Sequence, residues 1–194
     1  PDDLRSLRLR IERAVPVGFD QHQGEPRAVT AHRELGVRYR EVMDGYEDLR
    51  VHDLSRNTFT LKAARKASHQ IGTLGGGNHF IELCSGDDGR VWVTLHSGSR
   101  GTGNQLAQVH MKIAQQLSHN IGLVDRDLSV FLAGTPEMDA YLSDLWWAQG
   151  YALLNRDVML TAICDELRAS IAGIQFEAPI RCHHNYVADR KSVV

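Results

Sequence analysis

Two histidines, each beside a glycine-rich stretch, are the residues of this chain best suited to metal or phosphate chemistry. His79 follows three consecutive glycines and Asn78, and His96 precedes the glycine-rich segment 97–103. Neutral imidazole is a common ligand of first-row metal ions, and the N–H groups of a glycine-rich loop can cradle an anion. We interpret the pair as a phosphate-handling metal site, in preference to structural histidines beside incidental turns.

The segment between these histidines predicts a β-hairpin, because two apolar runs flank a turn rich in Ser, Gly and Asp. A turn centred on Asp87-Asp88 would place His79 opposite His96, and a turn centred one residue later would pair His96 with Ile81. Both registers put the two imidazoles on one face of the hairpin. Opposed Cβ atoms lie about 4.5–5.5 Å apart, so the pair could serve one metal centre or two adjacent ones.

Another source of imidazole lies far downstream, at His183-His184. Successive side chains of an extended segment point to opposite faces, so only one of these two is expected to join a shared site. The sequence contains no HExxH, paired CxxC or EF-hand spacing, so no local metal motif explains the histidines.

Arg100 lies in the second glycine-rich stretch, just before a predicted amphipathic helix. That helix carries one apolar stripe, formed by Leu106, Val109, Ile113 and Leu117. A glycine-rich loop that leads into a helix N-terminus favours phosphate, and an arginine adds a two-pronged donor. We therefore expect Arg100 to bind a phosphate group.

The elements that must position these residues are mostly helical. Apolar periodicity predicts helices near 3–15, 36–50 and 60–70, with a loop at 18–30. Thr135 and Pro136 predict the start of a long helix that ends near Ser170. Its aromatic residues are expected to pack in a core rather than stack on bases: Tyr141, Trp146, Trp147 and Tyr151. Helices combined with one antiparallel hairpin, without alternating βαβ units, indicate an α+β fold.

Several strings of residues closely resemble the RtcB-type RNA-splicing ligase family: 71–82, 96–101, 147–149, 154–157 and 182–187. The resemblance covers most of residues 10–188 and implies a truncated core of the RtcB fold. It further implies a ligase that depends on GTP and on two manganese ions. Such an enzyme joins RNA ending in a 2′,3′-cyclic phosphate or 3′-phosphate to RNA with a 5′-hydroxyl, through a guanylylated histidine.

The resemblance also implies roles for individual residues. His79 matches a ligand of one manganese ion, and His96 and His184 match ligands of the other. Arg100 matches a residue that holds an RNA phosphate. The segments that line the GTP site are matched by Asn78, His79, Phe80, Ile81, Glu82, His184 and Asn185. Strict strand alternation places Glu82 on the face opposite His79, so we expect a bend or bulge near Phe80 if both reach GTP.

The sequence departs from the family pattern at both ends. The family's upstream aspartate and cysteine metal ligands and its guanylylated histidine have no match among these residues. We expect residues 1–188 to be the central part of a single catalytic domain, inactive by itself, and residues 189–194 to be a non-native tail that matches a translated sequencing adapter. The alternative is a metal-dependent phosphohydrolase, or a pseudoenzyme that binds metal and nucleotide.

Composition fits part of an enzyme that acts in the cytoplasm. The 194 residues are 42% hydrophobic, enough for one domain-sized core, and contain no apolar run long enough for a membrane span. Three scattered cysteines argue against a disulfide framework and fit a reducing compartment. The formal net charge of −2 argues against bulk coating of nucleic acid, so RNA would have to bind a local patch. The sequence does not indicate an oligomeric state.

Overall fold

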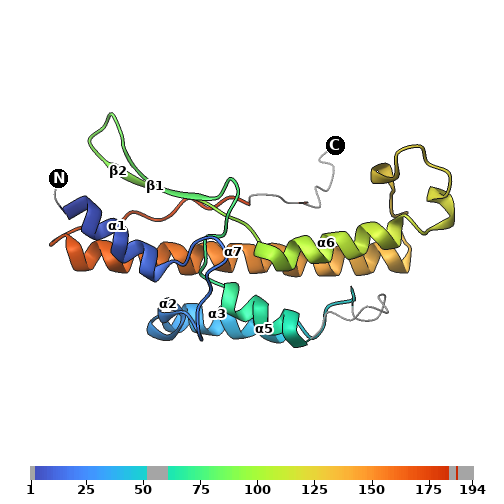
Figure 1. The fold of residues 1–194 in the computed structure, drawn as a ribbon, viewed down its shortest axis with the longest axis horizontal. Coiled ribbons are helices and arrows are strands. Elements are labelled where there is room, and N and C mark those ends of the chain that lie inside the picture. The colour runs from blue at the N-terminus through green and yellow to red at the C-terminus, as the bar shows by residue number, and fades with distance from the viewer. Residues whose placement is uncertain (1–2, 52–60, 184–186, 188–194) are drawn as a thin grey trace, which may run out of the picture.

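One long helix organises the molecule. The computed structural model describes residues 3–51, 61–183 and 187. Helix α7 (Pro136–Ser170) runs along most of the length of the fold (Figure 1). Helix α6 (Arg100–Ala114) packs along its N-terminal half, and helix α1 (Asp3–Ala14) packs along its C-terminal half.

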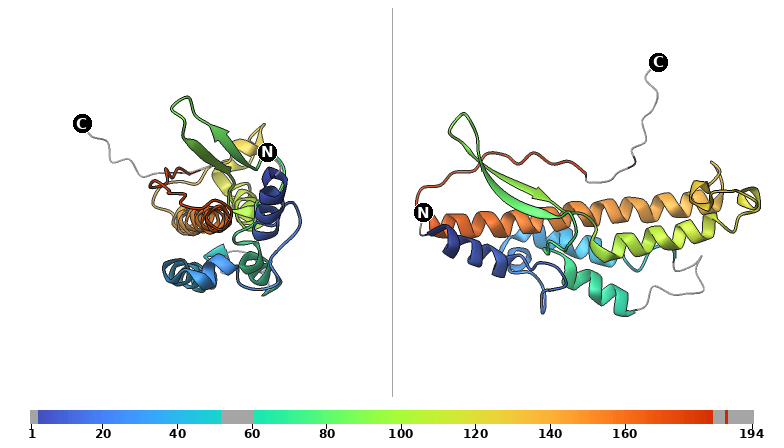
Figure 2. Two further views of the ribbon diagram at one scale, coloured as in Figure 1. Left: turned by 90° about the vertical axis from the view of Figure 1, so that its left-hand side faces the viewer. Right: turned by 45° about the horizontal axis from the view of Figure 1, so that its top comes forward.

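The remaining elements lie on two sides of α7. Helices α2 (Arg27–Ala31), α3 (Arg33–Asp44) and α5 (Leu61–Gln70) form a layer on one side, and a β-hairpin lies on the other (Figures 1 and 2). Two short 3₁₀ segments, Ser118–Asn120 and Arg126–Leu128, interrupt the connection from α6 to α7. Helices with one antiparallel sheet confirm the predicted α+β class.

The sequence predicted the long elements better than the short ones. The Thr135 hydroxyl accepts a hydrogen bond from the N–H of Met138 at 3.3 Å, which confirms the predicted start of α7. The helix predicted at 36–50 instead begins at Arg33 and ends at Asp44. The loop predicted at 18–30 contains the start of α2, a five-residue helix too short to give an apolar periodicity.

Two apolar cores lie along α7. The first joins α7 to the α2, α3 and α5 layer and to α6, and its α7 residues are Tyr151, Leu154 and Val158. The second joins α7 to α1, through Met159, Ile163 and Leu167 of α7. Tyr151 is fully buried, and the indole of Trp147 donates to the carbonyl of Val42 at 2.8 Å, as expected for core aromatics. The prediction that Trp146 packs in the core is wrong, because 45% of this residue is exposed.

The hairpin consists of β1 (Phe80–Ser85) and β2 (Val91–His96) in antiparallel register. Its inner face packs on the second core through Ile81, Val93 and Leu95. Its outer face carries the alternate residues Phe80, Glu82, Cys84, Trp92, Thr94 and His96. The apolar inner face therefore decides which residues the hairpin presents on the other side.

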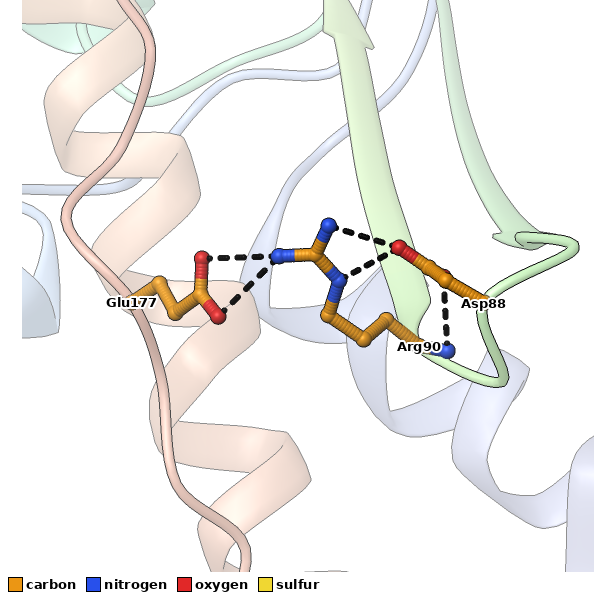
Figure 3. A network of polar contacts seen from close by, with 3 residues as sticks. All are labelled: Asp88, Arg90 and Glu177. Carbon is orange, nitrogen blue, oxygen red and sulfur yellow. Dashed lines mark hydrogen bonds and ion pairs between the residues drawn. The ribbon is translucent and has the colours of Figure 1, made fainter.

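A polar network ties the tip of the hairpin to the chain that follows α7 (Figure 3). The Arg90 guanidinium donates to the carboxylate of Asp88 at 2.6 Å and to the carboxylate of Glu177 at 3.2 and 3.3 Å. The backbone N–H of Arg90 also donates to Asp88 at 3.0 Å. These bonds lower the pKa of the Asp88 carboxyl, because they favour its ionised form.

Within the described residues, no helix is both long enough and apolar enough to cross a membrane.

Candidate metal and phosphate site

The observed register differs from both predicted registers. Phe80 pairs with His96, so the turn is centred on Asp88, with Gly89 in the left-handed region at a φ of +78°. His79 lies just before β1, yet the ring centroids of His79 and His96 are 6.1 Å apart, with their planes at 58°. The two imidazoles are close as predicted, but for another reason. Strand alternation does not govern His79, because it lies outside the strand.

His79 is oriented by a backbone carbonyl. Its Nδ1 lies 2.9 Å from the carbonyl oxygen of Leu74. A carbonyl can only accept, so Nδ1 carries the hydrogen and a neutral ring has its lone pair on Nε2. Histidines that bind metals in proteins are commonly held in this way, with one nitrogen donating to a carbonyl or carboxylate.

His96 lies on the outer face of the hairpin. The ring of Phe80 stacks on its imidazole, with centroids 5.5 Å apart and planes at 9°. Glu82, exposed and paired with Thr94, lies on the same face. From Phe80 to Ser85 the pairing is continuous through six residue pairs, so β1 contains no bulge. Because His79 lies before β1, strand alternation does not separate it from Glu82, and no bulge is required. Ile81 faces inward and its side chain packs on the second core, whereas Asn78 is exposed.

The glycine-rich loop before His79 is held by Arg100, which is the first residue of α6. Nε of Arg100 donates to the Thr73 hydroxyl at 2.9 Å, and an NH2 nitrogen donates to the carbonyl of Gly18 at 3.1 Å. Gly75 has a φ of +88°, and a Cβ on it would collide with this guanidinium. Burial lowers the pKa of Arg100. The Arg100 side chain therefore has a structural role in addition to any contact with phosphate.

Two loops surround the histidines: residues 72–79, which lead into β1, and residues 97–103, which follow β2. Three residues that hold these two loops together were not predicted from their types and spacing. Asn155, in the middle of α7, is fully buried and bonds to backbone groups of both loops. Ser97, next to His96, is 1% exposed and donates to the Leu74 carbonyl at 3.0 Å. Arg156 donates to the Ser97 carbonyl at 3.2 Å. One feature of the sequence could have indicated Asn155: an amide side chain, which is a weak helix former, lies among apolar residues of a predicted helix.

The second terminal nitrogen of Arg156 is buried and has no hydrogen-bond acceptor among the residues that the structure describes. Burial lowers the pKa of Arg156, against the opposing influence of Cys182 and Asp157. Arg156 therefore brings a positive charge close to Ser97, which directly follows His96.

The imidazoles of His79 and His96 suit a first-row metal ion. A neutral His79 has its lone pair on Nε2, and His96 lies beside it. Over residues 3–51 and 61–183, no three or more His, Cys, Asp or Glu side chains are grouped to hold a metal. His184 and Asn185, predicted for the metal and GTP sites, lie outside the described residues, as does the 189–194 tail.

Two other histidines have structural surroundings. His110 is buried, and its Nε2 donates to the carboxylate of Asp144 at 2.8 Å. Asp144 also accepts the backbone N–H groups of Arg50 and Val51, at 2.6 and 2.9 Å. His119 is exposed, between α6 and α7, and its Nε2 donates to the Val130 carbonyl at 3.0 Å.

Comparison with known proteins identifies the family. The family model described as tRNA-splicing ligase RtcB matches residues 1–194. The chain belongs to the RtcB family. It is 36% identical over 203 residues to RNA-splicing ligase RtcB1 of Escherichia coli. The alignment covers 96% of this chain and 47% of that protein. This membership confirms the resemblance seen in the sequence motifs.

Other RtcB relatives give the same result. The chain is 36% identical over 204 residues to RNA-splicing ligase RtcB of Escherichia coli K12, with the same coverage. It is 30% identical over 140 residues to RNA-splicing ligase RtcB of Mycobacterium bovis, which covers 64% of this chain and 32% of that protein. The chain thus spans about half the length of the Escherichia coli relatives.

Proposed function

We propose that this chain forms the part of an RNA ligase that holds manganese and GTP. The whole protein would join RNA ending in a 2′,3′-cyclic phosphate or a 3′-phosphate to RNA with a 5′-hydroxyl, through a GMP-histidine intermediate. The observation that carries the proposal is the His79–His96 pair, with ring centroids 6.1 Å apart between two glycine-rich loops. RtcB family membership over residues 1–194 supports it.

In this proposal His79 holds one Mn²⁺ ion, and His96 and His184 hold another. Bound Mn²⁺ would neutralise phosphate charge and activate the attacking group. The hydrogen bond from Nδ1 of His79 to the Leu74 carbonyl supports this role, because it directs the lone pair of the neutral ring to Nε2. The ring of Phe80 stacks on His96 and limits its rotation.

GTP is assigned to the segment 78–82 together with His184 and Asn185. The outer-face positions of Phe80 and Glu82 support this assignment, as does the exposure of Asn78. Ile81 would contribute backbone groups, because its side chain packs on the core. Arg100 is assigned to an RNA phosphate; a guanidinium has five N–H donors, and its bonds to Thr73 and Gly18 use two.

The location proposed for the protein is the cytoplasm. The three cysteines of the chain, Cys84, Cys164 and Cys182, are free thiols, which fits a reducing compartment.

The test is RNA joining by the full-length polypeptide that carries this chain. With Mn²⁺ and GTP, it should join a 3′-phosphate RNA to a 5′-hydroxyl RNA. His79→Ala and His96→Ala should each lower Mn²⁺ affinity and joining by more than about 100-fold, a larger loss than residues around a metal ligand usually give. His119→Ala is the matched control and should retain both, because His119 is exposed and lies in the 3₁₀ segment after α6.

Other outcomes identify the alternative functions. Release of the terminal phosphate without joining would indicate a phosphohydrolase. Binding of Mn²⁺ and GTP with neither reaction would indicate a pseudoenzyme. Residues 1–188 expressed alone should form no denaturation-stable adduct with labelled GTP, because no histidine among them matches the guanylylated one. A GMP adduct on a histidine of this chain would contradict that expectation.

A further inference from the structure

We propose that Asn155 is a positioning residue that sets the separation of His79 and His96. It lies in α7, outside both glycine-rich loops, and is fully buried. The proposal rests on the proposed function in one respect: the consequence of that separation is measured as Mn²⁺ binding.

The Asn155 amide bonds to both loops. Its Oδ1 accepts the backbone N–H groups of Gly72 and Thr73, at 2.7 and 3.3 Å. Its Nδ2 donates to the carbonyls of Thr73 and Gly98, at 3.3 and 3.1 Å, and lies 3.5 Å from the Ser97 hydroxyl. One amide therefore joins the segment that leads to His79 with the segment that follows His96.

The link continues from these segments to the imidazoles. The carbonyl of Leu74, the residue after Thr73, accepts both the Ser97 hydroxyl at 3.0 Å and Nδ1 of His79 at 2.9 Å. Ser97 directly follows His96 in the chain. The orientation of His79 and the end of β2 thus depend on the same carbonyl, whose position is set by the adjacent contacts of Asn155.

The helix makes Asn155 a fixed reference point. It lies well inside the 35-residue helix α7, between the core residues Tyr151 and Val158, which are 0% and 1% exposed. A side chain surrounded by packed neighbours keeps its rotamer, and metal sites need ligands held to within about 0.5 Å. Asn155 therefore transfers the rigidity of α7 to two loops that contain many glycines.

The chain contains a matched control for this proposal. Asn120 is also buried and also joins two segments, donating to the carbonyls of Ala114 and Val130 at 2.8 Å each and accepting the N–H of Val130 at 3.2 Å. These contacts join the end of α6 to the chain before α7 and involve neither loop. Loss of the Asn120 amide should therefore disturb the fold without removing any contact near His79 or His96.

The experiment compares Asn155→Leu with Asn120→Leu in the full-length polypeptide. Leucine is close to asparagine in shape and adds no charge that would attract a cation. Mn²⁺ affinity is measured by titration calorimetry, and backbone hydrogen exchange is measured over residues 72–80 and 96–101. Asn155→Leu should weaken Mn²⁺ binding at least about tenfold, the usual effect of losing a residue that supports a metal ligand. It should also speed exchange in both loops, whereas Asn120→Leu should change Mn²⁺ affinity less than twofold.

Equal losses of Mn²⁺ affinity in the two variants, or unchanged affinity in Asn155→Leu, would overturn the proposal. If Asn155→Leu does not fold, Ser97→Ala tests the same link, because it removes only the hydroxyl that binds the Leu74 carbonyl. It should weaken Mn²⁺ binding while the protein stays folded, and unchanged affinity would count against the proposal. If the wild type binds no Mn²⁺, the metal role fails, and Asn155 is judged by exchange alone: faster exchange in both loops supports positioning, and exchange confined to α7 refutes it.

Discussion

At the scale of single residues, the side chains around His79 and His96 hold the fold of the candidate site. Arg100 was expected to bind phosphate, yet its guanidinium donates to Thr73 and to the Gly18 carbonyl. Its neighbour in space, Gly75, must lack a side chain for this arrangement to form. A substitution at Arg100 therefore tests two roles, which separate when stability and ligand binding are measured independently.

Arg100→Lys should lower both stability and anion binding, although the charge is kept. A single ammonium on a flexible stem cannot reproduce a planar fork that reaches two acceptors. We expect the free energy of unfolding to fall by about 1.5–3 kcal/mol, the usual range for hydrogen bonds that involve charged groups. Urea unfolding measures the first effect, and RNA joining by the full-length polypeptide at limiting RNA measures the second. Wild-type values in both assays would show that the fork geometry is unimportant.

Two histidines outside the candidate site, His110 and His119, should respond differently to alanine. His110→Ala should lower the free energy of unfolding by about 3 kcal/mol, because it removes a buried donor to the buried Asp144 carboxylate. His119→Ala should change stability by less than about 1 kcal/mol, because His119 is exposed. Thermal unfolding of both variants provides the comparison. Equal stabilities would mean that the His110–Asp144 contact does not contribute.

At the scale of elements, residues 154–157 of α7 show how one helical turn reaches several parts of the fold. Leu154 packs in the first core, and Asn155 binds the two loops. Arg156 donates to the Ser97 carbonyl. Asp157 accepts from Arg38 of α3 at 2.7 Å and from Arg181 at 2.8 Å. Successive helical residues point about 100° apart, so four neighbours can contact four different segments.

The exposed ion pair between Arg90, at the hairpin tip, and Glu177 should affect local order more than stability. Arg90→Ala removes the bonds from the hairpin to Glu177, and we expect faster hydrogen exchange in residues 174–180 with little change in the melting temperature. High salt should speed exchange in the wild type in the same way, because it screens exposed ion pairs. A large drop in melting temperature would show that this contact supports the core.

At the scale of the whole molecule, buried tyrosines connect α7 to the layer formed by α2, α3 and α5. The hydroxyl of Tyr151 donates to the carbonyl of Ala67 in α5 at 2.7 Å. Tyr46 packs edge-on against Trp147 at 5.7 Å. Burial raises the pKa of Tyr46 to about 12, and it also raises the pKa of Tyr39 and Tyr151.

These tyrosines predict a loss of stability at alkaline pH. Unfolded tyrosines ionise near pH 10, whereas the buried ones keep their protons. The unfolded chain then binds fewer protons than the native one, so the free energy of unfolding falls as pH rises from about 10 towards 12. Tyrosinate absorbance and circular dichroism, followed together, should change in one transition. Ionisation of every tyrosine near pH 10 without unfolding would contradict this prediction.

The sequence by itself determined the family, the fold class, the long helices and the two histidine-bearing glycine loops. These features depend on local patterns: apolar periodicity, a capping Thr-Pro pair, and strings of residues in a characteristic order. The approach of His79 to His96 was also predicted, although the registers offered as its basis were wrong. Hairpin boundaries and a turn allow several registers, and local sequence does not choose among them.

Only the tertiary structure decided the register and the scaffold of the site. A shift of one residue exchanges the two faces of a strand, and packing of Ile81, Val93 and Leu95 on the core selected the observed face. The contacts of Asn155 join residues separated by 57 to 83 positions in the chain. Such bonds form only when α7 lies against both loops, so the residue type alone could not reveal them.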